Sequence, residues 1–184
     1  MDYKMNIAGL DRYLPICRVT DDLYIAGFVI FGDCELTTAC ATELLKIAPE
    51  YDYIITAESK GIPLAHEMAR LHGDDYYFLA RKAPKLYMTG VLKVDVKSIT
   101  TEAVQTLYMD TRDAERMKGK KILIVDDVVS TGESLRAVET LVNEAGGIIC
   151  GKMTILAEGD AKNMPDLKYL NPLPLFDKNG NIIG

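Results

Sequence analysis

Two adjacent carboxylates followed by hydroxyl-bearing residues are the stretch of this chain with the clearest chemical potential. Asp126 and Asp127 come directly after four aliphatic residues, 122–125. Like charges at the end of a buried strand are costly unless a ligand or a cation offsets their desolvation. Three hydroxyl side chains follow within seven positions: Ser130, Thr131 and Ser134. The stretch therefore offers acceptors for hydroxyl groups or a cation beside donors for a phosphate, a combination that suits a sugar phosphate with a vicinal diol.

A helix is expected to begin directly after this stretch, at about Gly132. Apolar residues keep helical spacing from there to Gly146 and Gly147: Leu135, Val138, Leu141, Val142 and Ala145. The free N–H groups and the dipole at the start of a helix form an anion site. The carboxylates and the helix start thus lie at the carboxyl end of a strand, where open parallel sheets bind their ligands.

The remaining elements predict an α/β fold. Helical patterns cover 36–47 and 61–73, and strand patterns cover 51–57, 76–81, 104–109, 120–125 and 148–156. Alternation of strands and helices through 51–156 favours a mainly parallel sheet flanked by helices. Residues 83–103 show no clear period and predict a long excursion, and 1–34 is predicted to be rich in loops. We expect one domain over 1–184, with both ends capping the sheet.

Composition narrows the classes of function. The chain has 184 residues, 48% of them hydrophobic and 26% charged, with a net charge of -6, which argues against a general grip on nucleic acid or an anionic membrane. The longest apolar runs are far shorter than the roughly 20 residues of a membrane span. The N-terminus shows no signal-peptide pattern. Four cysteines without C-x-x-C spacing indicate reduced, buried thiols and a cytoplasmic location.

Three other kinds of structure can place acidic residues after an apolar strand. A Walker B strand also ends in acids, but no G-x-x-x-x-G-K-[ST] motif occurs in the chain. A receiver domain would carry its acid pair near the first strand. A solvated turn after a core strand remains open, although turn chemistry alone does not explain the T-G-x-S continuation.

The stretch ILIVDDVVSTGES (122–134) resembles the signature with which type I phosphoribosyltransferases bind phosphoribosyl pyrophosphate (PRPP). The resemblance implies that Asp126 and Asp127 are catalytic, face the ribose hydroxyls and contact Mg²⁺, indirectly through PRPP or water. It implies a cradle for the ribose and its 5′-phosphate made of Val128, Val129, Ser130, Thr131, Gly132, Glu133 and Ser134. The chain departs from the common pattern at Glu133 and Ser134, where glycine and threonine are frequent.

Two further stretches resemble the parts of this family that bind pyrophosphate. TAESKG (56–61) is similar to the loop between a strand and a helix that receives pyrophosphate, which often contains a non-proline cis peptide, here before Ser59. LARKAPKLY (79–87) is similar to the R-K-x-x-K-L segment of adenine phosphoribosyltransferases; without the family, such a basic cluster also fits a solvated surface. The implied pyrophosphate-binding residues are Glu58, Ser59, Lys60, Arg81, Lys82 and Lys85.

Two weaker resemblances concern the base. KSITTEAVQ (97–105) is similar to the lid segment of adenine phosphoribosyltransferases, which implies a catalytic Glu102 that manages a purine proton, and also to the lid of xanthine phosphoribosyltransferases. AGFVIFGD (26–33) resembles the hood segment of the adenine enzymes, which implies base contacts from Phe28, Val29, Ile30 and Phe31. An exposed loop glutamate and ordinary core residues are the alternatives.

The resemblance as a whole implies a Mg²⁺-dependent purine phosphoribosyltransferase that joins PRPP to a free purine base, with adenine favoured over hypoxanthine, guanine or xanthine. It implies a hood over 1–34, an α/β core over 35–157 with a lid over 83–103, a C-terminal cap over 158–184, and a homodimer. A non-catalytic PRPP sensor that regulates genes is the alternative, disfavoured because the chain has no basic stripe for nucleic acid. A pyrimidine enzyme is disfavoured by the R-K-A-P-K-L and hood resemblances.

Overall fold

The protein is built around a five-stranded parallel sheet. The computed structural model describes residues 2–97 and 104–183. The strand order is β10-β9-β8-β4-β5, and every pairing in this sheet is parallel. The strands are β4 (Tyr53–Ala57), β5 (Phe78–Ala80), β8 (Lys121–Val129), β9 (Ile148–Glu158) and β10 (Leu167–Leu173). The predicted fold class is therefore confirmed.

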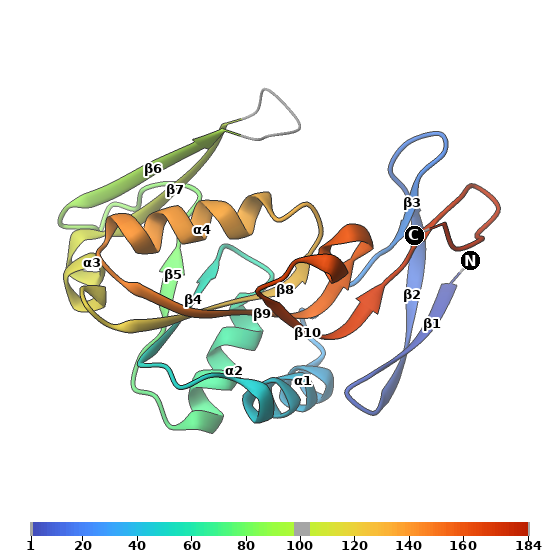
Figure 1. The fold of residues 1–184 in the computed structure, drawn as a ribbon, viewed down its shortest axis with the longest axis horizontal. Helices are drawn as coiled ribbons and strands as arrows, with labels where there is room; N and C mark the ends of the chain where they lie inside the picture. The colour runs from blue at the N-terminus through green and yellow to red at the C-terminus, as the bar shows by residue number, and fades with distance from the viewer. Residues whose placement is uncertain (1, 98–103, 184) are drawn as a thin grey trace.

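Helices cover both faces of the sheet (Figure 1). Helices α1 (Cys34–Ile47) and α2 (Ile62–His72) lie on one face, and α4 (Glu133–Glu144) lies on the other, near the short α3 (Thr111–Met117). The helix ends follow local chemistry: the Asp33 side chain accepts a hydrogen bond from the Leu36 amide at the start of α1. Gly73 ends α2 in the left-handed conformation, with φ of 89°.

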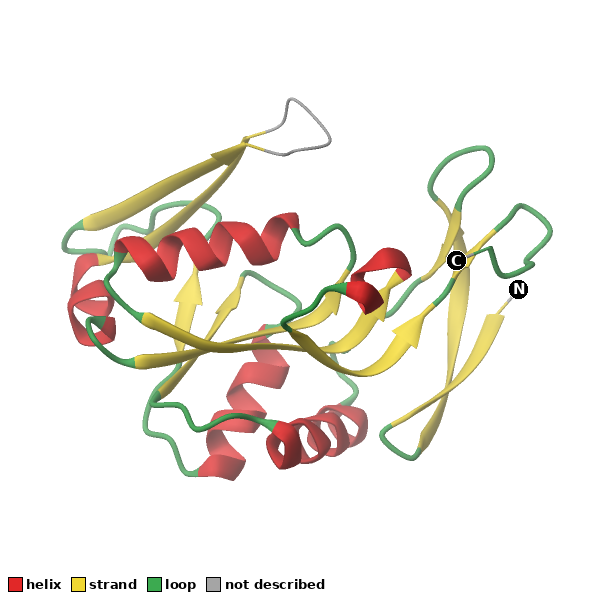
Figure 2. Ribbon diagram, viewed as in Figure 1, coloured by secondary structure: helices red, strands yellow, loops and turns green. Residues whose placement is uncertain are grey.

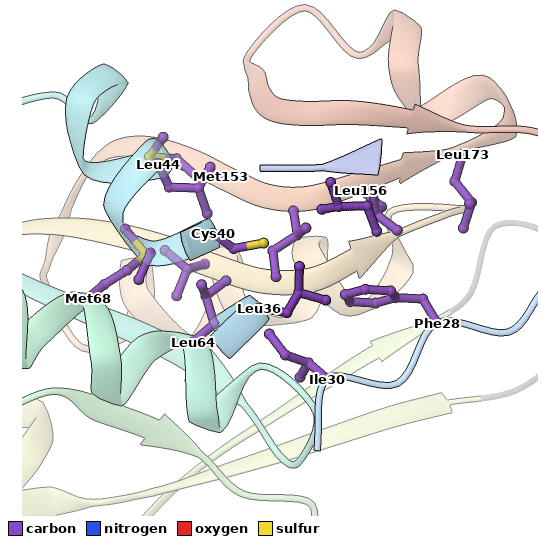
Figure 3. Packing of buried hydrophobic residues seen from close by; sticks show 14 of the residues in the cluster. Phe28, Ile30, Leu36, Cys40, Leu44, Leu64, Met68, Met153, Leu156 and Leu173 are labelled. Atoms are coloured by element: carbon purple, nitrogen blue, oxygen red, sulfur yellow. The ribbon is translucent and has the colours of Figure 1, made fainter. Parts of the chain in front are cut away.

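The core consists of two clusters of buried apolar side chains, one on each face of the sheet. Figure 3 shows the cluster between the sheet and α1 and α2, where Leu36, Leu44, Leu64 and Met68 meet Met153 of β9. Each such side chain contributes roughly 1.5–3 kcal/mol when fully buried. These two layers hold the carboxyl ends of the strands in fixed positions.

Three strands occupy most of residues 2–26, where the sequence pattern predicts a loop-rich segment, and that prediction is wrong there. The strands β1 (Asp2–Ile7), β2 (Leu10–Arg18) and β3 (Tyr24–Ala26) form an antiparallel sheet whose fourth strand is β11 (Leu175–Phe176). Ala8 and Gly9 both have positive φ and join β1 to β2 in a two-residue turn. Figure 2 shows this small sheet standing beside the main one. Few residues of β1 and β2 are buried, so these strands show only a weak alternating pattern in the sequence.

Residues 83–103 also contain a strand that the sequence prediction missed. Strand β6 (Val91–Lys97) pairs antiparallel with β7 (Val104–Asp110), and this ribbon packs against α4. Arg81 and Tyr108 exchange two backbone hydrogen bonds that join the ribbon to the end of β5. The predicted strand over 104–109 is confirmed. The residues 98–103, with the predicted catalytic Glu102, lie outside the described residues.

The cysteine prediction is correct in part. All four cysteines are free, and Cys40 is buried, but Cys17 and Cys34 are exposed. Cys17 lies in the unpredicted strand β2, and Cys34 is the first residue of α1. Over 2–97 and 104–183, no helix combines the length and apolar character that a membrane crossing requires.

Candidate active site

The carboxyl ends of β4 and β8 open into one cavity. It has a volume of about 340 Å³. The described residues that line it are 57–60, Lys82, Gln105 and the continuous run 126–135. The parallel sheet brings 57–60 and 126–135 together, because both segments leave their strands at the same edge.

The two carboxylates differ in their surroundings. Asp127 is only 2% exposed and Asp126 is half-buried. The Asp127 amide donates a hydrogen bond of 2.9 Å to Asp126 Oδ1. Burial, followed by the neighbouring Asp127 charge, raises the pKa of Asp126 well above the usual carboxyl range.

Asp127 carries a buried acceptor without a hydrogen bond. Its Oδ2 atom has no hydrogen-bond partner among the described residues, and the ammonium of Lys60 lies 3.5 Å from it. Lys60 is 48% exposed, so water screens this ion pair. A buried carboxylate oxygen of this kind is a position where a ligand hydroxyl or a cation would remove an electrostatic cost.

The start of α4 forms as the helical spacing predicts. Gly132 precedes the helix with φ of 74°, a conformation that favours glycine, and a Cβ there would lie 2.7 Å from Met164 Cε. The N-cap residue Gly132 has no side chain to cap this helix, and the Glu133 amide donates a long hydrogen bond of 3.4 Å to Thr131 Oγ1. The Ser134 hydroxyl accepts a hydrogen bond of 3.1 Å from Gln105 of β7. The predicted phosphate cradle is thus a helix N-terminus that opens into the cavity.

The loop after β4 matches its prediction in the backbone. The peptide bond between Glu58 and Ser59 is cis, as the resemblance implied. Gly61 lies so close to the sheet that a Cβ there would be 2.2 Å from Thr56 Oγ1 and 3.0 Å from Asp126 Oδ1. Glycine at position 61 therefore allows this loop to reach the acidic pair.

Glu58 contacts the side chains of Arg81 and Lys85 and the backbone amide of Lys82. Arg81 donates a hydrogen bond of 2.6 Å to Glu58 Oε1, the Lys82 amide donates one of 2.9 Å to Oε2, and Lys85 Nζ lies at 3.8 Å. Although burial alone would raise the pKa of Glu58, the Arg81 hydrogen bond lowers it below the usual range. Of these cations, Lys82 lines the cavity and Arg81 and Lys85 do not.

The four predicted base-contacting residues divide into two pairs. Phe28 and Ile30 are buried, and Figure 3 shows the Phe28 ring directed toward Leu36 in the core. Val29 and Phe31 are exposed. Phe28 and Val29 line a second cavity of about 380 Å³, between the small antiparallel sheet and the edge of the main sheet.

Sequence reasoning missed two polar residues that line these cavities, Gln105 and Glu158. Gln105 lies between Val104 and Thr106 on β7, and the packing of β6 and β7 against α4 brings it to Ser134. Glu158 is the last residue of β9, and Asp127 lies two residues before the end of β8. A position near the carboxyl end of a predicted parallel strand could therefore have indicated Glu158 as a candidate.

The acidic pair provides oxygen ligands of the kind that Mg²⁺ prefers. The buried Asp127 Oδ2 without a hydrogen bond is consistent with a nearby cation. In the described part of the chain, no group of three or more potential metal-ligating side chains comes together. The residues thus fit a Mg²⁺ that keeps water or ligand oxygens in most of its positions.

Comparison with known proteins agrees with this arrangement. The family profile described as "Phosphoribosyl transferase domain" matches residues 38–174. The chain belongs to the phosphoribosyltransferase family. The matched residues include the loop after β4, the cation cluster and the whole stretch from Asp126 to Ser134.

Individual relatives carry two different names. The chain is 33% identical over 129 residues to a hypoxanthine/guanine phosphoribosyltransferase of Methanothermococcus okinawensis, covering 70% of this chain and 66% of the relative. It is 30% identical over 123 residues to an adenine phosphoribosyltransferase of Petrotoga mobilis, covering 67% and 62%. The chain thus spans slightly less than two thirds of the length of these curated relatives.

The fold is shared with solved phosphoribosyltransferase structures. The adenine phosphoribosyltransferase of Thermoanaerobacter pseudethanolicus superposes with a TM-score of 0.66 at 21% identity, covering 78% of this chain and 84% of that one. This similarity supports the architecture of the type I phosphoribosyltransferase fold.

Proposed function

We propose that this protein is a purine phosphoribosyltransferase that transfers the 5-phosphoribosyl group of PRPP to a free purine, with adenine as its preferred base, and so serves purine salvage. The products are a nucleoside 5′-monophosphate and pyrophosphate. The observation that carries the proposal is the shared cavity in which an acidic pair, a helix N-terminus and a cationic loop meet. Each of these parts suits one group of PRPP.

The phosphate and the ribose take opposite sides of this cavity. The backbone N–H groups at the start of α4 and the hydroxyls of Ser130, Thr131 and Ser134 donate to the 5′-phosphate. Asp126 and Asp127 accept hydrogen bonds from the two ribose hydroxyls. Because the carboxylates are negative, they also favour the positive charge that develops on the ribose as the leaving group departs.

The leaving pyrophosphate faces the loop after β4. Lys60 and Lys82 line the cavity there and offset the charge on the pyrophosphate. Arg81 and Lys85 sit behind them, paired with Glu58. In this proposal the Glu58 carboxylate holds the cations in place and moderates their attraction for the product.

In this proposal, Asp126 and Asp127 also hold Mg²⁺ together with PRPP. Mg²⁺ bound with PRPP near Asp126 and Asp127 would supply charge neutralisation for the pyrophosphate. The protein residues then orient the ribose and keep the reacting carbon away from water.

The choice of adenine rests on the R-K-A-P-K-L and hood resemblances. The first-named curated relative supports a second candidate, a hypoxanthine/guanine phosphoribosyltransferase. A cytoplasmic location, a homodimer and the catalytic role of Glu102 stay predictions.

A panel of radiolabelled bases tests the function directly. The protein, PRPP and Mg²⁺ are incubated separately with adenine, hypoxanthine, guanine, xanthine and orotate, and nucleotide formation is measured. The proposal expects the highest kcat/KM with adenine. Higher kcat/KM with hypoxanthine or guanine would replace the base assignment, and no turnover with any base would refute the enzymatic function.

A further inference from the structure

The second cavity adjoins the first at the place where a base would meet the ribose. Its volume is about 380 Å³. Three residues line both cavities: Lys60, Val128 and Ser130. If PRPP occupies the first cavity as proposed, the base must approach the reacting carbon across this shared wall.

Most of the second cavity is apolar, and one carboxyl group interrupts it. The end of β3 with the residues that follow it (25–29), Val128 and Leu173 form its apolar walls, which suit a flat ring. Glu158, at the end of β9, brings a half-buried carboxyl group into the same cavity. Lys60 and Glu158 are the charged side chains among the described residues that line it.

The Glu158 carboxyl group is not used to cap the turn that follows it. Glu158 precedes a short 3₁₀ helix, η1 (Gly159–Asn163), but its side chain makes no hydrogen bond to the start of that helix. Its polar neighbours are instead Ser130 and Lys60, the two polar residues of the wall between the cavities. The carboxyl group thus belongs to the cavity and lies beside its boundary with the first one.

The surroundings of Glu158 suit a group that exchanges a proton. Burial raises the pKa of Glu158 above the usual carboxyl range, although Ser130 and the Lys60 charge act in the opposite direction. A carboxylate with a raised pKa is a better proton acceptor than an exposed one, and it stays protonated up to a higher pH.

Resting on the proposed function, we infer that Glu158 is a catalytic proton acceptor for the incoming base. A free purine carries one proton on its imidazole ring and loses it during the reaction. The C1–N bond forms as the C1–O bond to pyrophosphate breaks, and that electron pair leaves with the pyrophosphate. The N–H electron pair stays on the ring, and its proton passes to the Glu158 carboxylate and afterwards to water.

The test compares Glu158→Gln with Glu158→Asp under saturating PRPP and Mg²⁺, using the base on which the wild type is most active. Glutamine keeps the size of the side chain but cannot accept the proton. We expect kcat to fall about 100-fold in the glutamine variant, within the range of general base catalysis. The KM for the base and the calorimetric affinity for PRPP should change less than threefold.

The pH profile separates this role from simple binding. Wild-type kcat should fall on the acid side as both Asp126 and Glu158 become protonated, because the pKa of each is raised. Glu158→Gln should lack the Glu158 part of this limb, so its kcat should fall less steeply with decreasing pH. Glu158→Asp should retain the limb with an intermediate kcat. Asp160→Asn, which removes an exposed carboxyl two residues away, is the matched control and should behave as the wild type.

Each contrary result has a distinct meaning. If the wild type turns over no base, the proposed function itself fails. If the wild type is active but Glu158→Gln keeps the wild-type kcat and the full acid limb, or changes only the KM for the base, the role of Glu158 is refuted and the proposed function stands. Loss of the acid limb in Glu102→Gln with an unchanged limb in Glu158→Gln would likewise overturn it.

Discussion

The two cavities are built in different ways. The described wall of the first comes largely from one continuous run, 126–135, and is rich in carboxylates, hydroxyls and backbone N–H groups. The second is assembled from a segment near the start of the chain, the ends of β8 and β9, and Leu173 of β10, and it is mostly apolar. Binding phosphate requires a local backbone geometry, whereas enclosing a flat ring requires distant segments to pack together. The lining of the first cavity can therefore be recognised from a sequence motif, whereas the lining of the second depends on the tertiary fold.

The largest effect is expected from the double substitution Asp126→Asn with Asp127→Asn. It should lower kcat at least 1,000-fold, because both negative groups that favour positive charge on the ribose are removed. Turnover is measured by nucleotide formation, and circular dichroism checks the fold. Activity within tenfold of the wild type would show that the polar cavity does not carry the chemistry.

A smaller effect is expected from Gly132→Ala. The backbone there has φ of 74°, and the new Cβ would approach Met164 Cε at 2.7 Å. We expect the KM for PRPP to rise tenfold or more, because the start of α4 must shift. Gly119→Ala is the matched control, since Gly119 has φ of 70° and open space around it.

Both glycine variants should lose about 1–2 kcal/mol of stability, the usual cost of a left-handed alanine. Only Gly132→Ala should change the KM for PRPP. An equal rise in both variants would mean that general stability, and not the position of the α4 start, controls PRPP binding.

A several-fold effect is expected from Glu58→Gln. The change removes the negative charge that Arg81 and Lys85 now face at 2.6 and 3.8 Å. Pyrophosphate should then inhibit more strongly, because the cations are less neutralised. Product-inhibition constants measure this, with Glu144→Gln on the exposed end of α4 as the charge control. Weaker inhibition would indicate that Glu58 mainly orients Arg81.

The smallest effect concerns stability and the second cavity. A carboxyl group whose pKa is raised by folding, such as Glu158, stabilises the protein at low pH relative to neutral pH. The wild type should therefore match Glu158→Gln below the ordinary glutamate pKa and become less stable than it as the pH rises through the raised pKa. Melting temperatures across this range measure the difference. If the melting temperatures of the wild type and Glu158→Gln differed by the same amount at every pH, the Glu158 carboxyl group would be exposed to water.

The sequence predicted the parts of the molecule that are specified locally. The start of α4 at Gly132, the end of α2 at Gly73 and the cis peptide before Ser59 all occur where they were expected. The strand predicted over 120–125 also forms, although it runs on through Asp126 and Asp127 to Val129. Each depends on a few neighbouring residues whose types fix the backbone or match a specific motif.

The sequence did not predict the features that depend on distant pairing. Strand β3 has only three residues, and β1 and β2 are largely exposed, so their alternation was weak. The hydrogen bond between Arg81 and Glu58 forms because β4 and β5 end side by side. Glu158 lines the second cavity because β9 ends near residues 25–29. No motif within a single segment records such contacts.

The pairing of β11 with β3 has a consequence for the order of assembly. Leu175 and Phe176 join Ile25 and Tyr24 in one sheet, although about 150 residues separate them along the chain. Closing so long a loop carries an entropic cost that only the finished core can repay. During synthesis, the nascent chain completes the motif at the start of α4 well before β11 emerges from the ribosome. We therefore expect the small sheet, and with it the wall of the second cavity formed by 25–29, to take its final position last.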